Sequence, residues 1–119
     1  MTLGDLDAAR DWGYAKDFVD AMWLILQQNQ PDDHVLATGK SHTIRDLLQI
    51  AFDHVGLKWQ DHVQIDERFK RPADACELLG NPTNAHQRLG WKPSLSFADL
   101  ITKMVDSDLQ ALQTSQPQE

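Results

Sequence analysis

The clearest structural signal in the sequence is the stretch Thr43-Ile44-Arg45-Asp46-Leu47-Leu48-Gln49-Ile50-Ala51-Phe52-Asp53-His54-Val55-Gly56. From Ile44 to Val55 its apolar residues recur at the i, i+3, i+4, i+7, i+8 and i+11 positions, which predicts an α-helix with one buried face. Thr43 and Asp46 have the spacing of a capping box at the helix start. Gly56 stands where a left-handed residue commonly ends a helix. The stretch therefore predicts a helix over residues 44–55 that packs on its neighbours through one side.

Three more helices and some short strands are predicted around this helix. Apolar periodicity and terminal residues predict helices over residues 14–28, over residues 83–89, and from the Ser96–Asp99 capping box to about residue 112. Short apolar or alternating runs predict strands over residues 34–38, 62–66 and 78–80. These strands are too few for a complete doubly wound sheet. The sequence therefore predicts an α/β fold, in the form of a small mixed helix-strand lobe that packs on something else.

The length of 119 residues suits one domain or part of a larger one. Hydrophobic residues make up 41% of the chain and charged residues 24%, as in ordinary globular domains. We expect residues 1–113 to form the domain. Residues 114–119 are rich in Gln, Ser and Pro, and we expect them to form a disordered tail.

Charge and composition exclude several classes of partner. Eleven Lys and Arg against eighteen Asp and Glu give a net charge of −7, which argues against a nucleic-acid or anionic-membrane surface. No run of about eighteen apolar residues is present, so no membrane-spanning helix is expected. The N-terminus lacks the basic and apolar regions of a signal peptide, and the single Cys76 fits a reducing compartment. We therefore expect a cytoplasmic protein.

Sequence motifs for cofactors, metals and catalysis are missing. The six glycines are widely spaced, so no glycine-rich loop can cradle a phosphate. The five histidines show no His-x-x-x-His pairing, and one cysteine cannot make a zinc knuckle. We therefore expect this chain to hold no cofactor, no metal and no catalytic residue.

Two segments place cations beside aromatic side chains: Arg10-Asp11-Trp12-Gly13-Tyr14 and Arg68-Phe69-Lys70-Arg71. A guanidinium is a rigid fork of donors that matches phosphate or carboxylate oxygens. Arg10 and Arg71 could therefore clamp a diphosphate from separate loops, while an aromatic ring stacks on a base or sugar. The alternative is that each arginine pairs with a nearby surface carboxylate: Asp7, Asp11, Glu67 or Asp74.

Acidic and aromatic residues near the N-terminus also admit more than one interpretation. Four aspartates could do acid–base work or bind a hard cation, but their spacing resembles no EF-hand loop, which favours structural roles. These aspartates are Asp7, Asp11, Asp17 and Asp20. The tryptophans are expected to anchor the core or a lobe interface, and Trp12 could instead stack on a ligand because it lies between Arg10 and Tyr14.

Several motifs together indicate a family. The longest is Arg10-Asp11-Trp12-Gly13-Tyr14-Ala15-x-Asp17-Phe18-Val19-x-Ala21-Met22-Trp23. The others are Ala37-Thr38-Gly39, Arg71-Pro72, Leu78-Leu79-Gly80-Asn81-Pro82-Thr83 and Leu89-Gly90-Trp91-Lys92-Pro93. Over about residues 3–112 the chain resembles the C-terminal part of the GDP-mannose 4,6-dehydratase family, which belongs to the extended short-chain dehydrogenases/reductases.

The resemblance implies a substrate, a cofactor and candidate site residues. Family members convert GDP-mannose to GDP-4-keto-6-deoxymannose, and their N-terminal Rossmann domain binds NADP and carries the catalytic residues. Their smaller C-terminal domain binds the GDP part of the substrate. Arg10 and Arg71 match family arginines that contact the nucleotide sugar. Asp74 stands where the family motif Arg-Pro-x-Glu has its Glu, so its carboxylate reaches one methylene less far.

The resemblance also implies that an essential part is absent from this chain. Tyr14 is followed by Phe18 where a Tyr-x-x-x-Lys pair would have lysine. We therefore expect a substrate-binding lobe whose Rossmann half is missing, inactive alone, with a Rossmann-domain half or a full-length dehydratase subunit as its partner. The first alternative is a non-catalytic fragment or docking module for a full-length dehydratase. The second is a lobe of another nucleotide-sugar epimerase or reductase.

Overall fold

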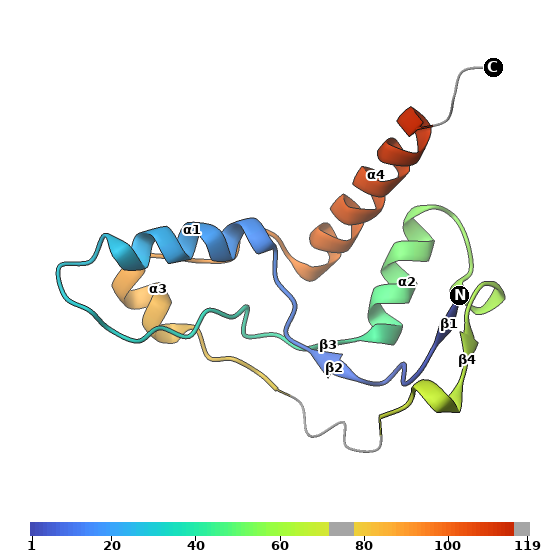
Figure 1. Cartoon of the computed structure of the whole chain (residues 1–119), viewed down its shortest axis with the longest axis horizontal. Coiled ribbons are helices and arrows are strands. Elements are labelled where there is room, and N and C mark those ends of the chain that lie inside the picture. Colours follow the sequence, from blue (N-terminus) through green and yellow to red (C-terminus); the bar gives the residue numbers. More distant parts are fainter. Residues whose placement is uncertain (72–77, 116–119) are drawn as a thin grey trace.

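A computed structural model describes residues 1–71 and 78–115 of the chain and shows a mixed α/β fold (Figure 1). The helices are α1 (Ala15–Leu26), α2 (Ile44–His54), α3 (Thr83–Leu89) and α4 (Phe97–Ser115). The strands are β1 (Thr2–Leu3), β2 (Ala9–Arg10), β3 (His42–Thr43) and β4 (Gln64–Ile65). Two short 3₁₀ turns are η1 (Trp59–Asp61) and η2 (Glu67–Phe69). The four helices agree with the prediction, with ends that differ by a few residues.

Helix α2 forms as its sequence predicts. The Thr43 hydroxyl accepts a hydrogen bond from the Asp46 N–H at 3.1 Å, and the Asp46 carboxylate accepts one from the Thr43 N–H at 2.9 Å. Both bonds of the capping box are therefore present. Gly56 follows the helix with a φ of +74°, the left-handed conformation that glycine adopts without strain. Leu48 is the buried centre of the apolar face.

Strand pairing is short and joins distant parts of the chain. β1 and β4 pair in parallel, with Thr2 opposite Gln64, and β2 and β3 pair antiparallel, with Arg10 opposite His42. The predicted strand over residues 62–66 therefore forms as two residues. The prediction of a strand over residues 34–38 was wrong, because this segment has no ladder partner among the described residues. The predicted strand over residues 78–80 is reduced to one isolated bridge, between Leu78 and Arg10.

The hydrophobic core lies between α1 and α3. Its buried centre is Ala21, Ala85 and Trp91, and the partly buried Phe18, Leu24, Leu36 and Leu89 pack around it. Asp17 is buried beside this core, where its backbone carbonyl accepts the Trp91 indole N–H at 2.8 Å. Its carboxylate accepts both the N–H and the hydroxyl of Ser94, at 2.8 Å and 2.6 Å. Asp17 of α1 therefore binds the loop that leads into α4.

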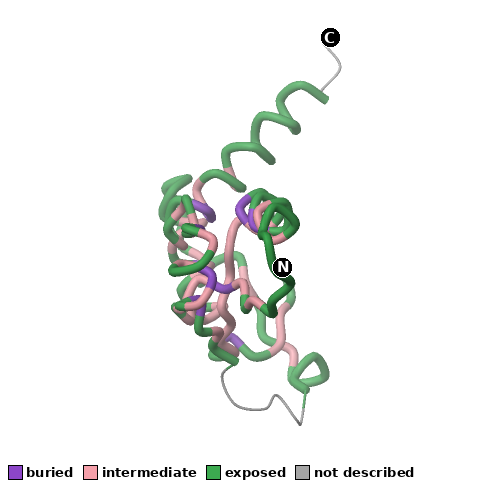
Figure 2. The backbone as a smooth tube through the Cα atoms, turned by 90° about the vertical axis from the view of Figure 1, so that its left-hand side faces the viewer, coloured by how far each residue is buried: buried purple, intermediate pink, exposed green. Residues whose placement is uncertain are grey.

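The molecule is flat and open. Its extents are 55 × 44 × 20 Å, and its radius of gyration is 17.8 Å, against about 13.5 Å for a compact domain of this length. Its accessible surface is 8910 Å², against about 6500 Å² for a folded monomer of this mass. Figure 2 shows buried backbone only in short patches, and the far part of α4 exposed all round. The chain therefore has the shape of a layer and not of a closed globule.

Helix α4 leaves the body of the molecule after its first turns (Figure 1). Leu100 and Ile101 are buried, and His54 of α2 makes a 2.6 Å contact from Nε2 to the carboxylate of Asp106. The helix extends to Ser115, so residues 114 and 115 of the predicted tail are helical, and residues 116–119 lie outside the described part. Among the described residues, none of the helices combines the length and the apolar character needed to cross a lipid bilayer.

Candidate functional site

Arg10 lies at the centre of the molecule, in the last position of β2. Its backbone is opposite His42 of β3 on one side and bridges to Leu78 on the other. Its side chain is half-buried, and Nη1 donates a 2.7 Å hydrogen bond to the Ala9 carbonyl. Three separate segments of the chain thus meet at this arginine.

Arg71 is exposed and follows the η2 turn. The cations before it are paired: Arg68 with Asp66 at 2.7 Å, and Lys70 with Glu67 at 2.9 Å. Hydrogen bonds from the Arg68 side chain and backbone lower the pKa of Asp66, and the hydrogen bond to Glu67 raises the pKa of Lys70. Arg68 and Lys70, the cations that precede Arg71, are therefore each paired with a carboxylate of the same turn.

The β1–β4 pair holds the N-terminus against the segment that precedes Arg71. Gly4, just after β1, lies so close to η2 that an added Cβ would be 2.5 Å from the Phe69 carbonyl oxygen. Beyond Arg71, the chain returns to bridge Arg10 through Leu78. Asp74 lies between these points, outside the described residues. Arg10 is therefore bridged to the residue that follows this gap, and Arg71 is the residue that precedes it.

The carboxylates of the acidic cluster near the N-terminus have separate partners in the structure. Asp7 pairs with Arg45 at 3.1 Å and Asp20 with Lys16 at 2.9 Å. Asp11 accepts hydrogen bonds from the Thr38 hydroxyl and from the N–H groups of Thr38 and Gly39, and Asp17 binds Ser94 as described above. No cluster of His, Cys, Asp or Glu among the described residues could hold a metal ion. These contacts support the structural interpretation.

A pocket of about 760 Å³, which the sequence did not reveal, lies between β3, α2 and the start of α4. Trp12, His42 and Phe97 form an aromatic group in its wall: the Trp12 and Phe97 ring centres are 5.6 Å apart, and His42 stacks on Phe97 at 4.0 Å. Lys40 and Lys92 also line it. These residues lie far apart in the sequence, so no local pattern could have indicated the pocket.

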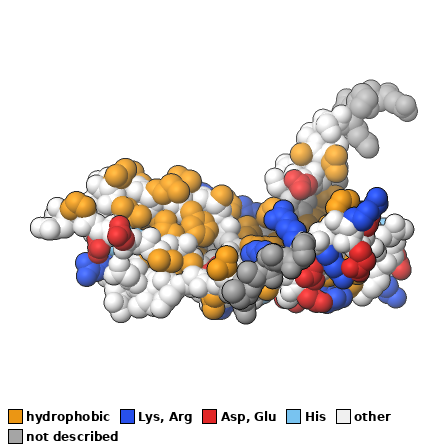
Figure 3. Space-filling model, turned by 60° about the horizontal axis from the view of Figure 1, so that its bottom comes forward, with side chains coloured by type: hydrophobic (Ala, Val, Ile, Leu, Met, Phe, Trp, Pro, Cys, Tyr) orange, Lys and Arg blue, Asp and Glu red, His pale blue; other side chains and the backbone are white. Residues whose placement is uncertain are grey.

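The tryptophans divide between the core and an uncovered surface. Trp91 is buried, whereas Trp23 on α1 is 62% exposed. Its neighbours on α1 are exposed too: Val19, Met22 and Leu26. Figure 3 shows hydrophobic side chains gathered over the half that contains α1 and α3, while charged side chains gather over the other half. The outer face of α1 is therefore an apolar surface of the kind that usually meets another protein surface.

The fold matches a part of several solved nucleotide-sugar enzymes. The dTDP-glucose 4,6-dehydratase of Bacillus anthracis, solved in complex with NAD, matches 94% of this chain and 35% of its own, with a TM-score of 0.81 and 16% identity. The UDP-glucose 4-epimerase of Thermotoga maritima, solved with UDP-glucose, matches 92% of this chain and 34% of its own, with a TM-score of 0.79 and 23% identity.

Sequence similarity identifies the family of this chain. The family model for GDP-mannose 4,6 dehydratase matches residues 1–104. GDP-mannose 4,6 dehydratase 1 of Arabidopsis thaliana is 51% identical over 110 residues, which are 92% of this chain and 30% of that relative. The chain belongs to the GDP-mannose 4,6-dehydratase family, as its motifs predict, and it spans about a third of the length of the curated relatives it matches.

Proposed function

We propose that this chain is the substrate-binding third of a GDP-mannose 4,6-dehydratase, and that the NADP-binding, catalytic half lies outside these 119 residues. The observation that carries the proposal is family membership over nearly the whole chain combined with coverage of 30% of the relative. The sequence has neither a glycine-rich dinucleotide turn nor a Tyr-x-x-x-Lys pair. The chain alone would therefore bind and orient the nucleotide sugar without converting it.

Arg10 and Arg71 are the residues we assign to the diphosphate or ribose side of the substrate. Arg71 follows the segment that the β1–β4 pair holds against the N-terminus, and the backbone of Arg10 bridges to Leu78. A guanidinium fork donates two hydrogen bonds to a phosphate, and two forks from different segments would fix its orientation. Asp74 is assigned as an acceptor for a hydroxyl or base N–H. With half of the pocket absent, we expect weak binding of GDP-mannose.

NADP is assigned to the missing half, because the sequence lacks the glycine-rich turn of a dinucleotide site. NADP would supply the hydride chemistry of the complete enzyme. This chain's part in the reaction is to hold the nucleotide end of the substrate, so that the sugar is directed toward the catalytic half.

The exposed apolar outer face of α1 supports the hypothesis that a partner protein covers it. Leu26 is 79% exposed and Trp23 62% exposed, although burying such a side chain stabilises a protein by about 1.5–3 kcal/mol. A Rossmann-domain half, or a full-length dehydratase subunit, is the partner we assign to this face. The same surface favours the second candidate function, a non-catalytic docking module, because docking requires the face but not the arginine site.

Calorimetric titration with GDP-mannose and GDP tests the substrate assignment. Arg10→Ala and Arg71→Ala should each weaken binding about tenfold or more, since charge-assisted hydrogen bonds contribute about 1.5–3 kcal/mol. Arg88→Ala is the matched control, because Arg88 lies on α3 and pairs with Asp32, and neither residue is assigned to the substrate. Binding that survives both test substitutions undiminished would remove the arginines from the site. Competition by UDP-sugars as strong as by GDP-sugars would favour another nucleotide-sugar epimerase or reductase.

Dye binding and sedimentation test the proposed partner surface. The wild-type chain should bind a hydrophobic dye and self-associate, and Trp23→Ser should lower both. Lys16→Ser on the same helix is the control, because it leaves the apolar side chains in place. A monodisperse chain that binds no dye would count against both the missing half and the docking module.

A further inference from the structure

The carboxylate of Asp11, the residue directly after Arg10, binds a loop that is distant in the sequence. Its oxygens accept the Thr38 N–H at 3.1 Å and the Gly39 N–H at 3.0 Å, and they also accept the Thr38 hydroxyl. Hydrogen bonds to a charged acceptor are stronger than bonds between neutral groups. Asp11 therefore holds the connecting loop, residues 37–41, against the end of β2.

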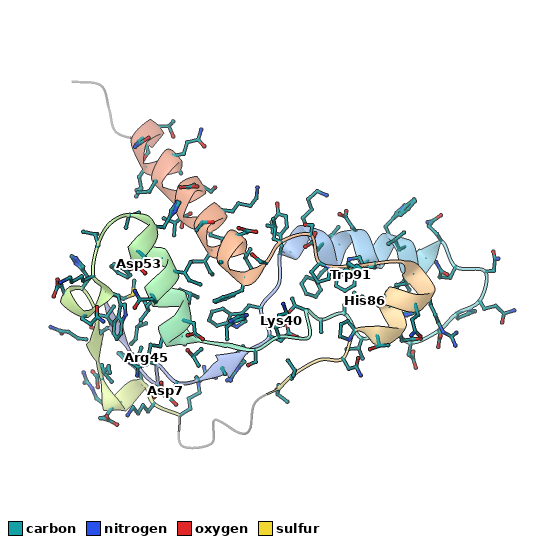
Figure 4. All side chains as sticks on the ribbon, turned by 180° about the vertical axis from the view of Figure 1, so that it is seen from behind. Asp7, Lys40, Arg45, Asp53, His86 and Trp91 are labelled. Atoms are coloured by element: carbon teal, nitrogen blue, oxygen red, sulfur yellow. The ribbon has the colours of Figure 1, made fainter. Side chains whose placement is uncertain are left out.

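The connecting loop also contacts the segment that bridges to Arg10. The backbone of Gly80 lies so close to Ala37 that the structure leaves no room for a Cβ at residue 80. Two residues earlier, Leu78 forms its backbone bridge with Arg10. Figure 4 shows Lys40, in the connecting loop, at the middle of the molecule. The contacts therefore form a closed ring that includes the connecting loop and the backbone of Arg10.

The backbone of Arg10 is held from several directions as a result. His42 of β3 lies opposite it, and Leu78 bridges to it from another segment. Asp11 completes the ring, and both Asp11 and Thr38 are half-buried, so water competes less for the bonds between them. The carboxylate of Asp11 is thus the group that connects the loop to the strand of the arginine.

We propose that Asp11 is a positioning residue for the substrate: through the connecting loop it fixes the backbone from which the Arg10 guanidinium reaches the diphosphate. This inference rests on the proposed function of Arg10. A long side chain binds more tightly when its attachment is fixed beforehand, because less freedom is lost on binding. Asp11 itself does not bind the diphosphate, since its oxygens already accept the donors of the loop and its charge would repel a phosphate.

Calorimetric titration with GDP-mannose tests this role from the far side of the contact. Thr38→Val removes the hydroxyl donor but keeps the shape of the side chain, and it should weaken binding about threefold to tenfold. Thr38→Ser keeps the donor and should bind within about twofold of wild type. Asp11→Ala removes both acceptor oxygens and should weaken binding about tenfold. Each effect should disappear in the Arg10→Ala background, because the residues act through one side chain.

Asp17→Ala is the matched control. Asp17 accepts the N–H and the hydroxyl of Ser94 as Asp11 accepts those of Thr38, but it holds a different loop. Asp17→Ala should lower the stability of the fold and leave the affinity for GDP-mannose within about twofold of wild type. A merely structural role of Asp11 would give both aspartate variants the same result, a loss of stability without a loss of affinity. Circular dichroism at the titration temperature shows whether each variant is folded.

NMR of the free chain gives a second readout that needs no ligand. The Nε–H signal of Arg10 should shift in Thr38→Val, which lies 28 residues away in sequence, and should stay in place in Asp17→Ala. An unmoved Arg10 signal in Thr38→Val would overturn the positioning role whatever the chain binds.

The binding results separate the two proposals. If Arg10→Ala weakens binding but Asp11→Ala does not, the positioning role fails and the proposed function stands. If the effect of Thr38→Val persists in full in the Arg10→Ala background, the positioning role also fails, because the loop then acts without the arginine. If Arg10→Ala binds as wild type does, the assignment of Arg10 to the substrate fails, and the positioning role fails with it.

Discussion

Removing the Asp17 carboxylate is the sharpest test of how this open fold is held together. Asp17 is 6% exposed and accepts two hydrogen bonds from Ser94, at 2.8 Å and 2.6 Å. These bonds connect α1 to the loop that leads into α4, across 77 residues of sequence. Asp17→Ala deletes both acceptors but leaves the backbone carbonyl that accepts the Trp91 indole.

The expected loss follows from the two bonds and their surroundings. A hydrogen bond to a charged group contributes about 1.5–3 kcal/mol. Ser94 is exposed, so water can replace part of what its donors lose. We therefore expect Asp17→Ala to lower the free energy of unfolding by about 2–3 kcal/mol. Asp17→Asn keeps one acceptor oxygen and should lose about half as much.

Urea unfolding followed by circular dichroism measures this difference. Asp20→Ala is the matched control on the same helix, because Asp20 is exposed and pairs with Lys16 at the surface. Such exposed pairs contribute little to stability, because water and salt screen them. The reasoning fails if Asp17→Ala lies within about 0.5 kcal/mol of wild type, or if Asp20→Ala costs as much as Asp17→Ala.

Three further predictions concern the capping box, β1 and the contact between α2 and α4. Hydrogen bonds from Thr43 lower the pKa of Asp46 below its ordinary value of 3.8. The contribution of this carboxylate to folding stability is therefore present above pH 3.8 and should be lost as the pH falls through the lower pKa of the folded state. Acid unfolding of Asp46→Ala should lack this loss of stability. Gly4→Ala should lower the melting temperature and destabilise the chain by about 1–3 kcal/mol, because its Cβ would be 2.5 Å from the Phe69 carbonyl oxygen; an unchanged melting temperature would contradict this. His54→Ala should cost less than about 1 kcal/mol in urea unfolding, because the pair with α4 is half-exposed, and a larger loss would show that the pair carries more of the packing.

Local signals predicted the helices well. The capping box and Gly56 define α2 within a few residues, because each signal acts on its own turn of helix. Gly90 ends α3 with a φ of +66°, and the Asn81 side chain accepts the Thr83 N–H just before the helix starts. Helix ends depend on neighbours in sequence, and one sequence is enough to find them.

Long-range pairing could not be predicted in the same way. A strand needs a partner, and residues 34–38 have the apolar composition of a strand but no ladder partner among the described residues. Strand β1 is only two residues long, which is too short to leave an alternating pattern, although its partner β4 lies within the predicted strand over residues 62–66. Sequence spacing likewise could not predict the hydrogen bonds from Ser94 to Asp17. Nor could it predict the contact between the Trp12 and Phe97 rings.

The exposed apolar face of α1 would affect how long this chain persists in a cell. Exposed apolar side chains are what chaperones and proteases recognise in incompletely assembled proteins. Trp23 and Leu26 would present such a signal continuously until another surface covered them. The abundance of the chain would then follow the supply of its partner, and not its own rate of synthesis. The exposed face of α1 would in this way make the amount of the chain depend on its assembly.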